Sequence, residues 1–352
     1  MLDKFFKLFS QDIGIDLGTA NTLVYVPGKG IVINEPSIIA VNQKTGQIVA
    51  VGNEAKNMVG RTPAHITVIR PLVEGVISDF ETTEEMLSYF IKKVQKSSTK
   101  LFARPAVVIG IPSNVTEVET RAGRAAAKHA GARKVFIVEQ PMAAAIGVKC
   151  PIHEPVGNII VDVGGGTADI AVISLKGIVV SKSLRVAGDR LDQDIIQYTR
   201  DEFKLLIGEK TAEDIKIAIG SATPLSGQEM EATMRGRDLI TGLPREIIVT
   251  DFDIREAISK SIRSLANAVK EVIEETPPEL ISDIMHRGIT LVGGGSQLKG
   301  LSEYLKKETR IPVNMAEDPI TVVARGMGII LENLEDYREI LIEHEDDIPP
   351  QY

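Results

Sequence analysis

The stretch IIVDVGGGTADI at residues 159–170 is the most informative part of the sequence. Its apolar run reaches Asp162, breaks into glycines before Thr167, and resumes as a second apolar run. Two such runs joined by a short Gly-rich turn predict a β-hairpin. Glycine allows the backbone to approach a ligand closely, and successive amide groups in such a turn can bind an anion. The stretch therefore predicts a phosphate-binding hairpin.

A second copy of this device lies near the start of the chain, in the stretch IGIDLGTANT at residues 13–22. The order is the same: an apolar run, Asp16, Gly18, Thr19 and a further apolar run. An Asp at the strand end repels phosphate unless a cation lies between them, and Mg²⁺ prefers carboxylates, waters and phosphate oxygens. One Gly-rich turn alone is most often only a turn. Two copies predict a duplicated domain, with one phosphate hairpin in each half and a nucleotide between the halves.

Composition limits the function classes. The chain has 352 residues, which is enough for two domains, and its net charge of −8 argues against a general nucleic-acid role. Cys150 is the one cysteine, so no internal disulfide can form and a reducing cytoplasm is expected. No apolar run approaches the length of a transmembrane helix. No Cys/His metal cluster, nucleophile elbow or Walker A sequence is present.

Two further motifs could act near a nucleotide. Glu139 follows the apolar run 135–138, and ligands of open α/β sheets bind at the carboxyl ends of strands. A Glu at such a position is by itself most often a surface residue, but beside two phosphate hairpins it could orient a water. The run 289–298 again breaks into glycines but lacks the Asp, which favours close approach to a flat ring or a phosphate over a metal role.

Two short apolar segments could touch a membrane. One helical face at the N-terminus would carry large apolar side chains at i, i+3, i+4 and i+7: Leu2, Phe5, Phe6 and Phe9. This face could lie on a membrane, or the segment could be a frayed or packed terminus. Leu101 and Phe102 stand in a polar turn between Lys100 and Arg104, and they either pack into the core or insert into lipid.

The patterns also predict local structure. Residues 31–33, 37–41 and 48–51 are expected to continue the first sheet as a meander. A helix is expected to begin at Gly188-Asp189 and to stop at Gly208. Capping pairs are expected at Thr116 with Glu119 and at Asp253 with Glu256.

Five ordered segments together resemble the actin / Hsp70 / sugar kinase ATPase superfamily. They are two phosphate hairpins (16–22 and 162–169), two small-residue helices (139–147 and 324–328) and a Gly-rich adenosine motif (292–297). Within this superfamily the chain is similar to the bacterial actins of the MreB family over essentially its whole length. The stretches that carry this likeness are DLGTANT at 16–22, NEPS at 34–37, IRP at 69–71, EQP at 139–141 and ARGMG at 324–328. Asn21 stands where eukaryotic actin carries a lysine.

The resemblance implies an α/β, actin-like ATPase fold with duplicated ribonuclease H-like domains around a nucleotide cleft and four subdomains. Domain I would span 1–145, with subdomain IB at roughly 34–66. Domain II would span 146–319, with subdomain IIB at roughly 184–248. Residues 320–352 would return to subdomain IA and end in an acidic tail.

The resemblance also implies the roles of site residues. Phosphate would be held by Thr19, Ala20 and Asn21 from one half and by Gly165, Gly166 and Thr167 from the other. The cofactor would further contact Glu213, Asp214, Ile215 and Lys216, with Glu213 and Lys216 on the ribose and adenine side, and it would contact Gly294, Gly295, Ser296, Gln297 and Leu298. Asp16 and Asp162 would order Mg²⁺, largely through water. Catalysis would involve Glu139, which positions the attacking water, together with Thr167 and Asp162.

The implied function is ATP-dependent assembly into paired protofilaments on the inner face of the cytoplasmic membrane, where they organise cell-wall synthesis and rod shape. Partners would be other copies of the chain, the membrane and cell-wall elongation proteins, and no nucleic acid. The alternative is a monomeric Hsp70-like or sugar-kinase-like ATPase of the same superfamily. The former would need a substrate-binding domain after the ATPase core, and the latter a catalytic base for a substrate hydroxyl.

Overall fold

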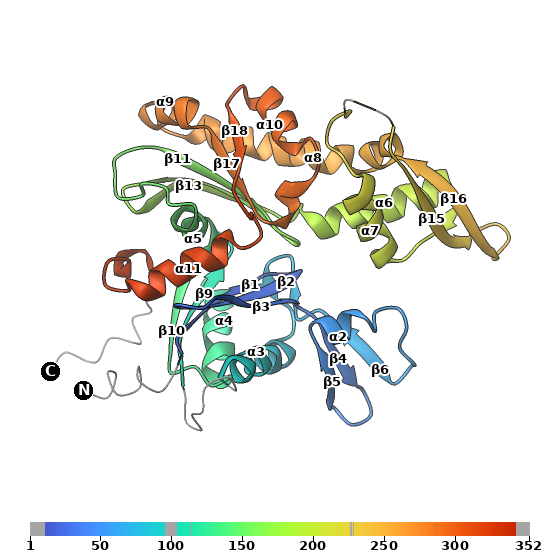
Figure 1. The fold of residues 1–352 in the computed structure, drawn as a ribbon, viewed down its shortest axis with the longest axis horizontal. Coiled ribbons are helices and arrows are strands. Elements are labelled where there is room, and N and C mark those ends of the chain that lie inside the picture. The colour runs from blue at the N-terminus through green and yellow to red at the C-terminus, as the bar shows by residue number, and fades with distance from the viewer. Residues whose placement is uncertain (1–10, 96–103, 114, 226, 228, 343–352) are drawn as a thin grey trace. The chain divides into compact units, whose positions relative to one another are not determined.

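A computed structural model describes residues 11–95, 104–113, 115–225, 227 and 229–342 (Figure 1). Leu2, Phe5, Phe6, Phe9, Leu101 and Phe102 lie outside the described residues, so the membrane prediction stays a prediction. Internal packing divides the chain into two units, each discontinuous in sequence. The first comprises residues 1–155, 173–178 and 321–352, and the second comprises 156–172 and 179–320. The domain and subdomain boundaries expected from the sequence stay predictions.

The first unit is built on a five-stranded sheet in the order β10-β9-β1-β2-β3. Its strands are β1 (Ile13–Leu17), β2 (Asn21–Val26), β3 (Gly30–Pro36), β9 (Ala106–Ile111) and β10 (Lys134–Glu139). The hairpin strands β1 and β2 are antiparallel, whereas β9 runs parallel to both β1 and β10. The carboxyl ends of β1, β9 and β10 therefore meet at one edge of the sheet.

Among the described residues of this unit, four helices are eight residues or longer: α3 (Phe80–Gln95), α4 (Glu117–His129), α5 (Gln140–Gly147) and α11 (Val322–Glu332). The capping box of Thr116 and Glu119 begins α4 as predicted. Helices α5 and α11 pack so closely that a Cβ on Gly326 would lie 1.8 Å from the carbonyl oxygen of Ala143. The small residues of both helices are therefore required for this contact. After α11, the short 3₁₀ helix η2 (Arg338–Ile340) leads the chain to the edge of β10, where Ile342 N donates to the Ile137 carbonyl at 2.9 Å.

The predicted continuation of the first sheet is wrong beyond β3. The next strands, β4 (Ile39–Asn42) and β5 (Ile48–Val51), form a separate sheet with β6 (Ile66–Ile69) in the order β5-β4-β6 (Figure 1). Helix α2 (Asn53–Lys56) follows β5, and the small hairpin β7 (Leu72–Val73) and β8 (Val76–Ile77) completes this region. Strand β4 takes its second partner from residues far along the chain, and alternating apolar residues do not specify that partner.

The second unit repeats the arrangement with the sheet order β13-β12-β11-β17-β18. Its strands are β11 (Asn158–Val163), β12 (Ala168–Ser174), β13 (Gly177–Leu184), β17 (Ile289–Val292) and β18 (Val313–Met315). As in the first unit, two parallel strands lie beside the first strand of the hairpin, since β17 pairs in parallel with both β11 and β18. The residues of both predicted hairpins thus occupy equivalent positions in their sheets.

The rest of the second unit is mainly helical. It contains α6 (Gly188–Glu202), α7 (Glu209–Ile219), α8 (Asp251–Glu275), α9 (Pro278–Arg287), η1 (Gly294–Gln297), α10 (Leu301–Thr309) and the strands β14 (Leu205–Leu206), β15 (Glu231–Asp238) and β16 (Pro244–Thr250). Helix α6 begins at the predicted place but ends at Glu202, because Leu205–Leu206 pair with β15. Gly208 is instead the N-cap of α7. The capping box of α8 is made by Thr250 with Asp253, so the predicted Asp253–Glu256 pair is wrong.

Candidate nucleotide-binding site

The loop of the first hairpin is held by a pair of buried hydroxyl groups. Ser37 Oγ donates to the Gly18 carbonyl at 2.6 Å, and its amide donates to the Ala20 carbonyl at 3.0 Å. Because the Ser37 hydroxyl proton is used in this way, the Thr22 hydroxyl is the donor of the 2.8 Å bond between the two side chains. Both Thr22 and Ser37 are fully buried. The loop conformation is therefore fixed by side chains from β2 and from the residue that follows β3.

The candidate phosphate ligands of this loop differ in how they are engaged. Thr19 Oγ1 accepts a hydrogen bond from the Gly75 amide at 2.9 Å, and Asn21 Nδ2 donates to Asn34 Oδ1 at 3.3 Å. Within the described part of the chain, the amide groups of Thr19 and Ala20 donate to no protein acceptor. Unbonded amides in a glycine turn are the donors that an anion requires.

Two carboxyl groups lie at the carboxyl edge of the first sheet. Asp16 on β1 is in register with Gly110 on β9, and Glu139 at the end of β10 is in register with Ile111. Gln140 Nε2 donates to Asp16 Oδ1 at 3.0 Å. Burial raises the pKa of Asp16 to about 6, and the hydrogen bond from Gln140 opposes this rise. The register thus places Asp16 close to the Glu139-Gln140 pair.

Glu139 is the last residue of β10 and the N-cap residue of α5. Burial raises the pKa of its carboxyl group, and a hydrogen bond with Ser113 opposes this rise. A partly buried carboxylate with a raised pKa is a better proton acceptor than an exposed one. Its position after a strand of a parallel pair matches the place where such sheets bind ligands.

The loop of the second hairpin is held mainly by backbone hydrogen bonds. Gly164 N donates to the Thr167 carbonyl at 2.9 Å, which closes the turn. The first turn of α6 then donates to the loop, from Gly188 N to the Gly164 carbonyl at 3.2 Å and from Asp189 N to the Gly165 carbonyl at 2.8 Å. The amide groups of Gly165 and Gly166 donate to no acceptor among the described residues. This loop, like the first, therefore offers backbone donors to an anion.

Asp162 lies at the carboxyl edge of the second sheet, in register with Val292 on β17. The residue that follows that strand, Gly293, has a φ of 81°, and a Cβ there would lie 2.3 Å from Asp162 Oδ1. Only glycine allows this approach. The buried Asp162 carboxyl is consequently packed directly against the start of the third Gly-rich motif.

The third Gly-rich motif, residues 292–297, contains η1. Only some of its groups are accessible to a ligand. Gly294 and Gln297 are exposed, whereas Gly295 and Leu298 are half-buried. Ser296 is buried, and its hydroxyl donates to the Gly293 carbonyl at 2.7 Å. The Ser296 side chain is thus used to close the turn.

The four candidate residues on α7 also differ. Asp214 is exposed and Glu213 is half-buried, but Ile215 packs into the core of the unit, so its side chain faces away from solvent. Lys216 is bound within the protein: its Nζ lies 2.8 Å from Asp192 Oδ1 and donates to the Gly188 carbonyl at 2.8 Å.

The structure brings α7 and the third motif together. Ser221 and Lys299 form a parallel β-bridge, in which Ala222 N donates to the Lys299 carbonyl at 2.7 Å. The Lys299 ammonium reaches back to the Ala218 carbonyl and lies 3.7 Å from Met230 Sδ. The segments 213–216 and 294–298, distant in sequence, are therefore fixed next to the same bridge.

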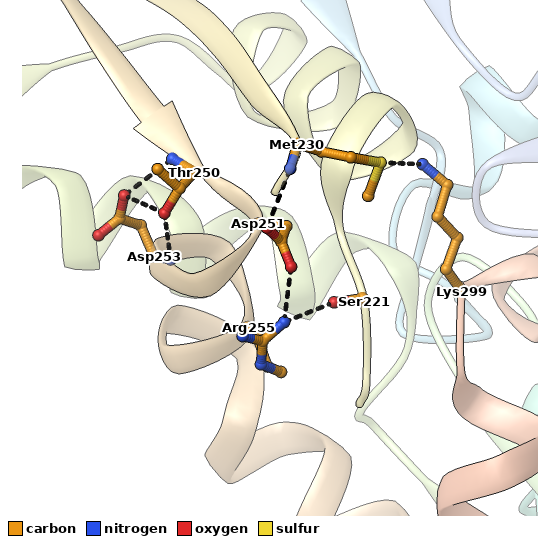
Figure 2. Close-up of polar contacts among 7 residues, drawn as sticks. All are labelled: Ser221, Met230, Thr250, Asp251, Asp253, Arg255 and Lys299. Carbon is orange, nitrogen blue, oxygen red and sulfur yellow. Dashed lines mark hydrogen bonds and ion pairs between the residues drawn. The ribbon is translucent and has the colours of Figure 1, made fainter. Parts of the chain in front are cut away.

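Arg255 on α8 supports this bridge (Figure 2). Its Nη1 donates to Ser221 Oγ at 3.1 Å and to Asp251 Oδ2 at 2.8 Å. The other carboxylate oxygen of Asp251 accepts from the Met230 amide at 3.2 Å. Sequence reasoning missed this network, as it missed Ser37 and Gln140, because their partners are remote in sequence and no local pattern marks them.

Two features of the described residues bear on membranes and metals. Among the helices described, none is long and apolar enough to cross a membrane. Nor do these residues contain a group of three or more His, Cys, Asp or Glu side chains arranged to hold a metal ion.

Comparisons with known proteins identify the family of the chain. A family model described as MreB/Mbl protein matches residues 10–339. The cell shape-determining protein Mbl of Bacillus cereus is 50% identical over 328 residues, which are 93% of this chain and 98% of that protein. The cell shape-determining protein MreB of Escherichia coli is 50% identical over 342 residues, which are 95% of this chain and 97% of that protein.

A solved structure shows the same architecture. Crystal structures of MreB5 of Spiroplasma citri, bound to ADP and to AMPPNP, match with a TM-score of 0.88 at 39% identity. The match covers 94% of this chain and 98% of the crystallised chain. The chain therefore belongs to the MreB/Mbl family and has the actin-like fold.

Proposed function

We propose that the chain binds ATP with Mg²⁺, hydrolyses it, and assembles into membrane-associated filaments. The observation that carries the proposal is the pair of equivalent hairpins. Each follows a buried Asp, and each presents loop amides without a protein acceptor in the described part of the chain, at Thr19 and Ala20 and at Gly165 and Gly166. Polar backbone groups of this kind are normally paired, so they are suited to phosphate oxygens.

In this proposal each unit supplies a phosphate-binding loop of its own. The phosphates are bound by Thr19, Ala20 and Asn21 and by Gly165, Gly166 and Thr167. The adenosine lies against the segment of Glu213, Asp214, Ile215 and Lys216 and against Gly294, Gly295, Ser296, Gln297 and Leu298. Because Ile215 is a core residue, its contribution is limited to the backbone. The ADP-bound and AMPPNP-bound crystals of Spiroplasma citri MreB5 support nucleotide binding by this chain.

The residues at the two strand ends fit a magnesium ion held largely through water. Asp16 and Asp162 are buried carboxyl groups beside the phosphate loops. Burial raises the pKa of Asp16 to about 6, and a neighbouring cation would favour its charged form. When bound, Mg²⁺ neutralises phosphate charge. The role of the chain itself is to position phosphates and ion through the amides and these two carboxylates.

Hydrolysis is assigned to Glu139 with help from Thr167. In phosphoryl transfer to water the protein mainly positions the nucleophile and stabilises charge, so one acceptor at the right place is sufficient. Glu139 is half-buried at the carboxyl edge of the first sheet, and its raised pKa makes it a stronger proton acceptor. We assign to it the orientation of the attacking water.

Replacing Glu139 with Gln tests this role. Phosphate release is expected to slow by about 10²- to 10⁴-fold, because the acceptor for the water proton is lost. Affinity for a fluorescent ATP analogue should change by less than about threefold, since the phosphate-binding amides remain. Glu117→Gln, at an exposed position on α4, is the control and should release phosphate at the wild-type rate. Normal phosphate release by Glu139→Gln would contradict the assignment.

The assembly part of the proposal follows from the family. Two relatives are named cell shape-determining proteins, and both are about half identical to this chain over nearly its full length. We infer paired protofilaments of this chain on the inner face of the cytoplasmic membrane, peripheral to it, where they organise cell-wall elongation proteins and rod shape. The membrane contacts are assigned to Leu2, Phe5, Phe6, Phe9, Leu101 and Phe102, which lie outside the described residues.

Negative-stain electron microscopy on an anionic lipid monolayer, with Mg-ATP, tests the assembly. Paired filaments lying on the lipid are expected. Isolated particles that still bind ATP under all salt conditions would instead identify a monomeric ATPase of the Hsp70-like or sugar-kinase-like kind, and a substrate screen would then separate those two.

A further inference from the structure

The two segments that are assigned to adenosine are joined directly beyond their ends. Ser221 follows α7 after a single glycine, and Lys299 follows Leu298, the last residue of the other segment. The two residues form the parallel β-bridge in which Ala222 N donates to the Lys299 carbonyl at 2.7 Å. A Cβ on Gly220 would lie 3.3 Å from Leu298 Cδ1, so the end of α7 also packs against Leu298. The bridge therefore fixes how far apart the two segments lie.

The bridge is held by a largely buried ion pair on α8 (Figure 2). Arg255 Nη1 donates to Ser221 Oγ at 3.1 Å, and the same atom donates to Asp251 Oδ2 at 2.8 Å. The Arg255 and Asp251 side chains are 16% and 10% exposed, and Ser221 is fully buried. Charged pairs that are partly buried are screened less by salt than pairs on the surface. Asp251 therefore keeps the guanidinium directed at the bridge.

The same ion pair also holds the chain where it returns from the bridge to β15. Asp251 Oδ1 accepts a hydrogen bond from Met230 N at 3.2 Å, and Asp251 N donates to the Met230 carbonyl at 2.9 Å. Met230 Sδ lies 3.7 Å from the Lys299 ammonium. Both residues of the bridge thus contact this network, one through Arg255 and the other through Met230 (Figure 2).

We propose that Arg255 is a positioning residue of the adenosine site, because it holds α7 and the third Gly-rich motif at a fixed separation. The inference rests on the proposed nucleotide binding, with the adenosine against both of these segments. Arg255 acts through Ser221 rather than by contact with the nucleotide. A site whose two sides are already fixed loses less conformational entropy when the ligand binds, so its affinity is higher. Loss of the Arg255 contact should accordingly weaken ATP binding without changing the phosphate-binding loops.

Ser221→Ala is the sharpest test, because it removes the bond between Arg255 and the bridge but leaves the ion pair with Asp251 in place. In the full chain, the dissociation constant for a fluorescent ATP analogue is expected to rise by about 3- to 10-fold. Phosphate release at saturating Mg-ATP should stay at the wild-type rate, since the phosphate-binding amides and Glu139 are unchanged. A general loss of structure would instead lower both the affinity and the turnover rate.

Substitutions of Arg255 itself should extend this result. Arg255→Leu removes the cation from Asp251 as well as the bond to Ser221, so the dissociation constant is expected to rise by about 10- to 100-fold. Adding Ser221→Ala to Arg255→Leu should weaken binding no further, since Ser221 acts through Arg255. Arg255→Lys should recover part of the affinity, because one ammonium can donate to both oxygens as Nη1 does.

The exposure of the bound base gives a second readout. Etheno-ATP, whose fluorescence comes from the base, should be quenched by acrylamide about twofold more efficiently when bound to Ser221→Ala than to the wild type, because a less rigid site opens more often. Arg235→Leu is the matched control in the same unit. It removes an ion pair with Glu246 in which the side chains are 79% and 55% exposed, so its affinity, turnover and quenching should equal those of the wild type.

Two results would overturn the inference. One is wild-type ATP affinity in both Ser221→Ala and Arg255→Leu. The other is a fall in turnover at saturating ATP as large as the fall in affinity, which would show a general structural role. Failure of the proposed function is distinguishable, because the wild type would then bind no ATP analogue. If Arg255→Leu does not fold, as judged by circular dichroism, Ser221→Ala and Arg255→Lys decide the same question.

Discussion

The two hairpins proposed to bind phosphate share the same sequence pattern but are held in different ways. The first is braced by side chains: the Ser37 hydroxyl bonds the Gly18 carbonyl, Thr22 bonds Ser37, and Gln140 bonds Asp16. The second is braced by backbone groups, from the first turn of α6 and from the close approach of Gly293 to Asp162. Equivalent loops can therefore be fixed by unrelated neighbours.

This difference determines which substitutions each hairpin tolerates. A side-chain hydrogen bond can be removed by a single substitution. The loss of stability is then limited to the cost of the groups left unpaired. Backbone contacts through glycine fail when any Cβ is added, because the neighbouring atoms cannot move apart without disturbing their own strands. The second hairpin should accordingly be the more sensitive of the two to small substitutions in its surroundings.

Gly293→Ala should have the largest effect on the second hairpin. The new Cβ would lie 2.3 Å from Asp162 Oδ1 and 2.4 Å from the Val163 carbonyl oxygen, at a φ of 81°. Strain and overpacking together are expected to lower the free energy of unfolding by about 4 kcal/mol, measured by urea denaturation. Gly294→Ala is the matched control, because its nearest neighbour would be 3.8 Å away. Equal losses for the two variants would show that the backbone contact does not hold this hairpin.

The Asp16→Asn variant tests how the buried charge of Asp16 affects the stability of the ligand-free protein. Burial raises the pKa of Asp16 from 3.8 to about 6, so the folded state binds the proton more tightly than the unfolded state. The stability that Asp16 contributes is therefore complete below about pH 4 and is lost as the pH rises through about 6.

Ionisation of Asp16 should cost up to about 3 kcal/mol at pH 7. Asp16→Asn is thus expected to raise the unfolding free energy at pH 7 and to weaken Mg-ATP binding. Thermal and urea unfolding between pH 4 and 7 measure the first effect. The variant will keep the similar pH dependence of Asp192, whose pKa burial also raises to about 6. An unchanged slope in the variant would assign the whole pH dependence to other groups.

Ser37→Ala should have the smallest of these three effects. It leaves the half-buried Gly18 carbonyl and the buried Thr22 hydroxyl without their partner, which is expected to cost about 2 kcal/mol in unfolding free energy. The fold should be retained. ATP affinity should fall only to the extent that the loop becomes less rigid. Asn21→Ala, which removes an exposed 3.3 Å bond in the same loop, is the control with an expected change below about 0.5 kcal/mol. If Ser37→Ala resembled this control, the side-chain brace would have no energetic role.

The repeated hairpins and the faces of the amphipathic helices follow from local sequence patterns. The order of Asp, Gly and Thr identified both loops, and their amides are available in each. The buried face of α3, which includes Met86 and Phe90, follows the helical spacing of its apolar residues, because a helix periodicity is local to the helix. The capping box at Thr116 was also predicted, since both of its hydrogen bonds join residues only three positions apart.

Features that depend on remote partners arise only in the folded chain. The strands β4 and β5 pair with β6 in a separate sheet, although the sequence pattern placed them in the first sheet. Leu205–Leu206 form a strand because they pair with β15. Lys216 forms an ion pair with Asp192. Ser221 forms a β-bridge with Lys299 and a hydrogen bond with Arg255. The physical reason is common to these cases. Periodicity and turn chemistry act within a few residues, whereas strand pairing and buried charge pairing depend on which distant groups the packed core brings together.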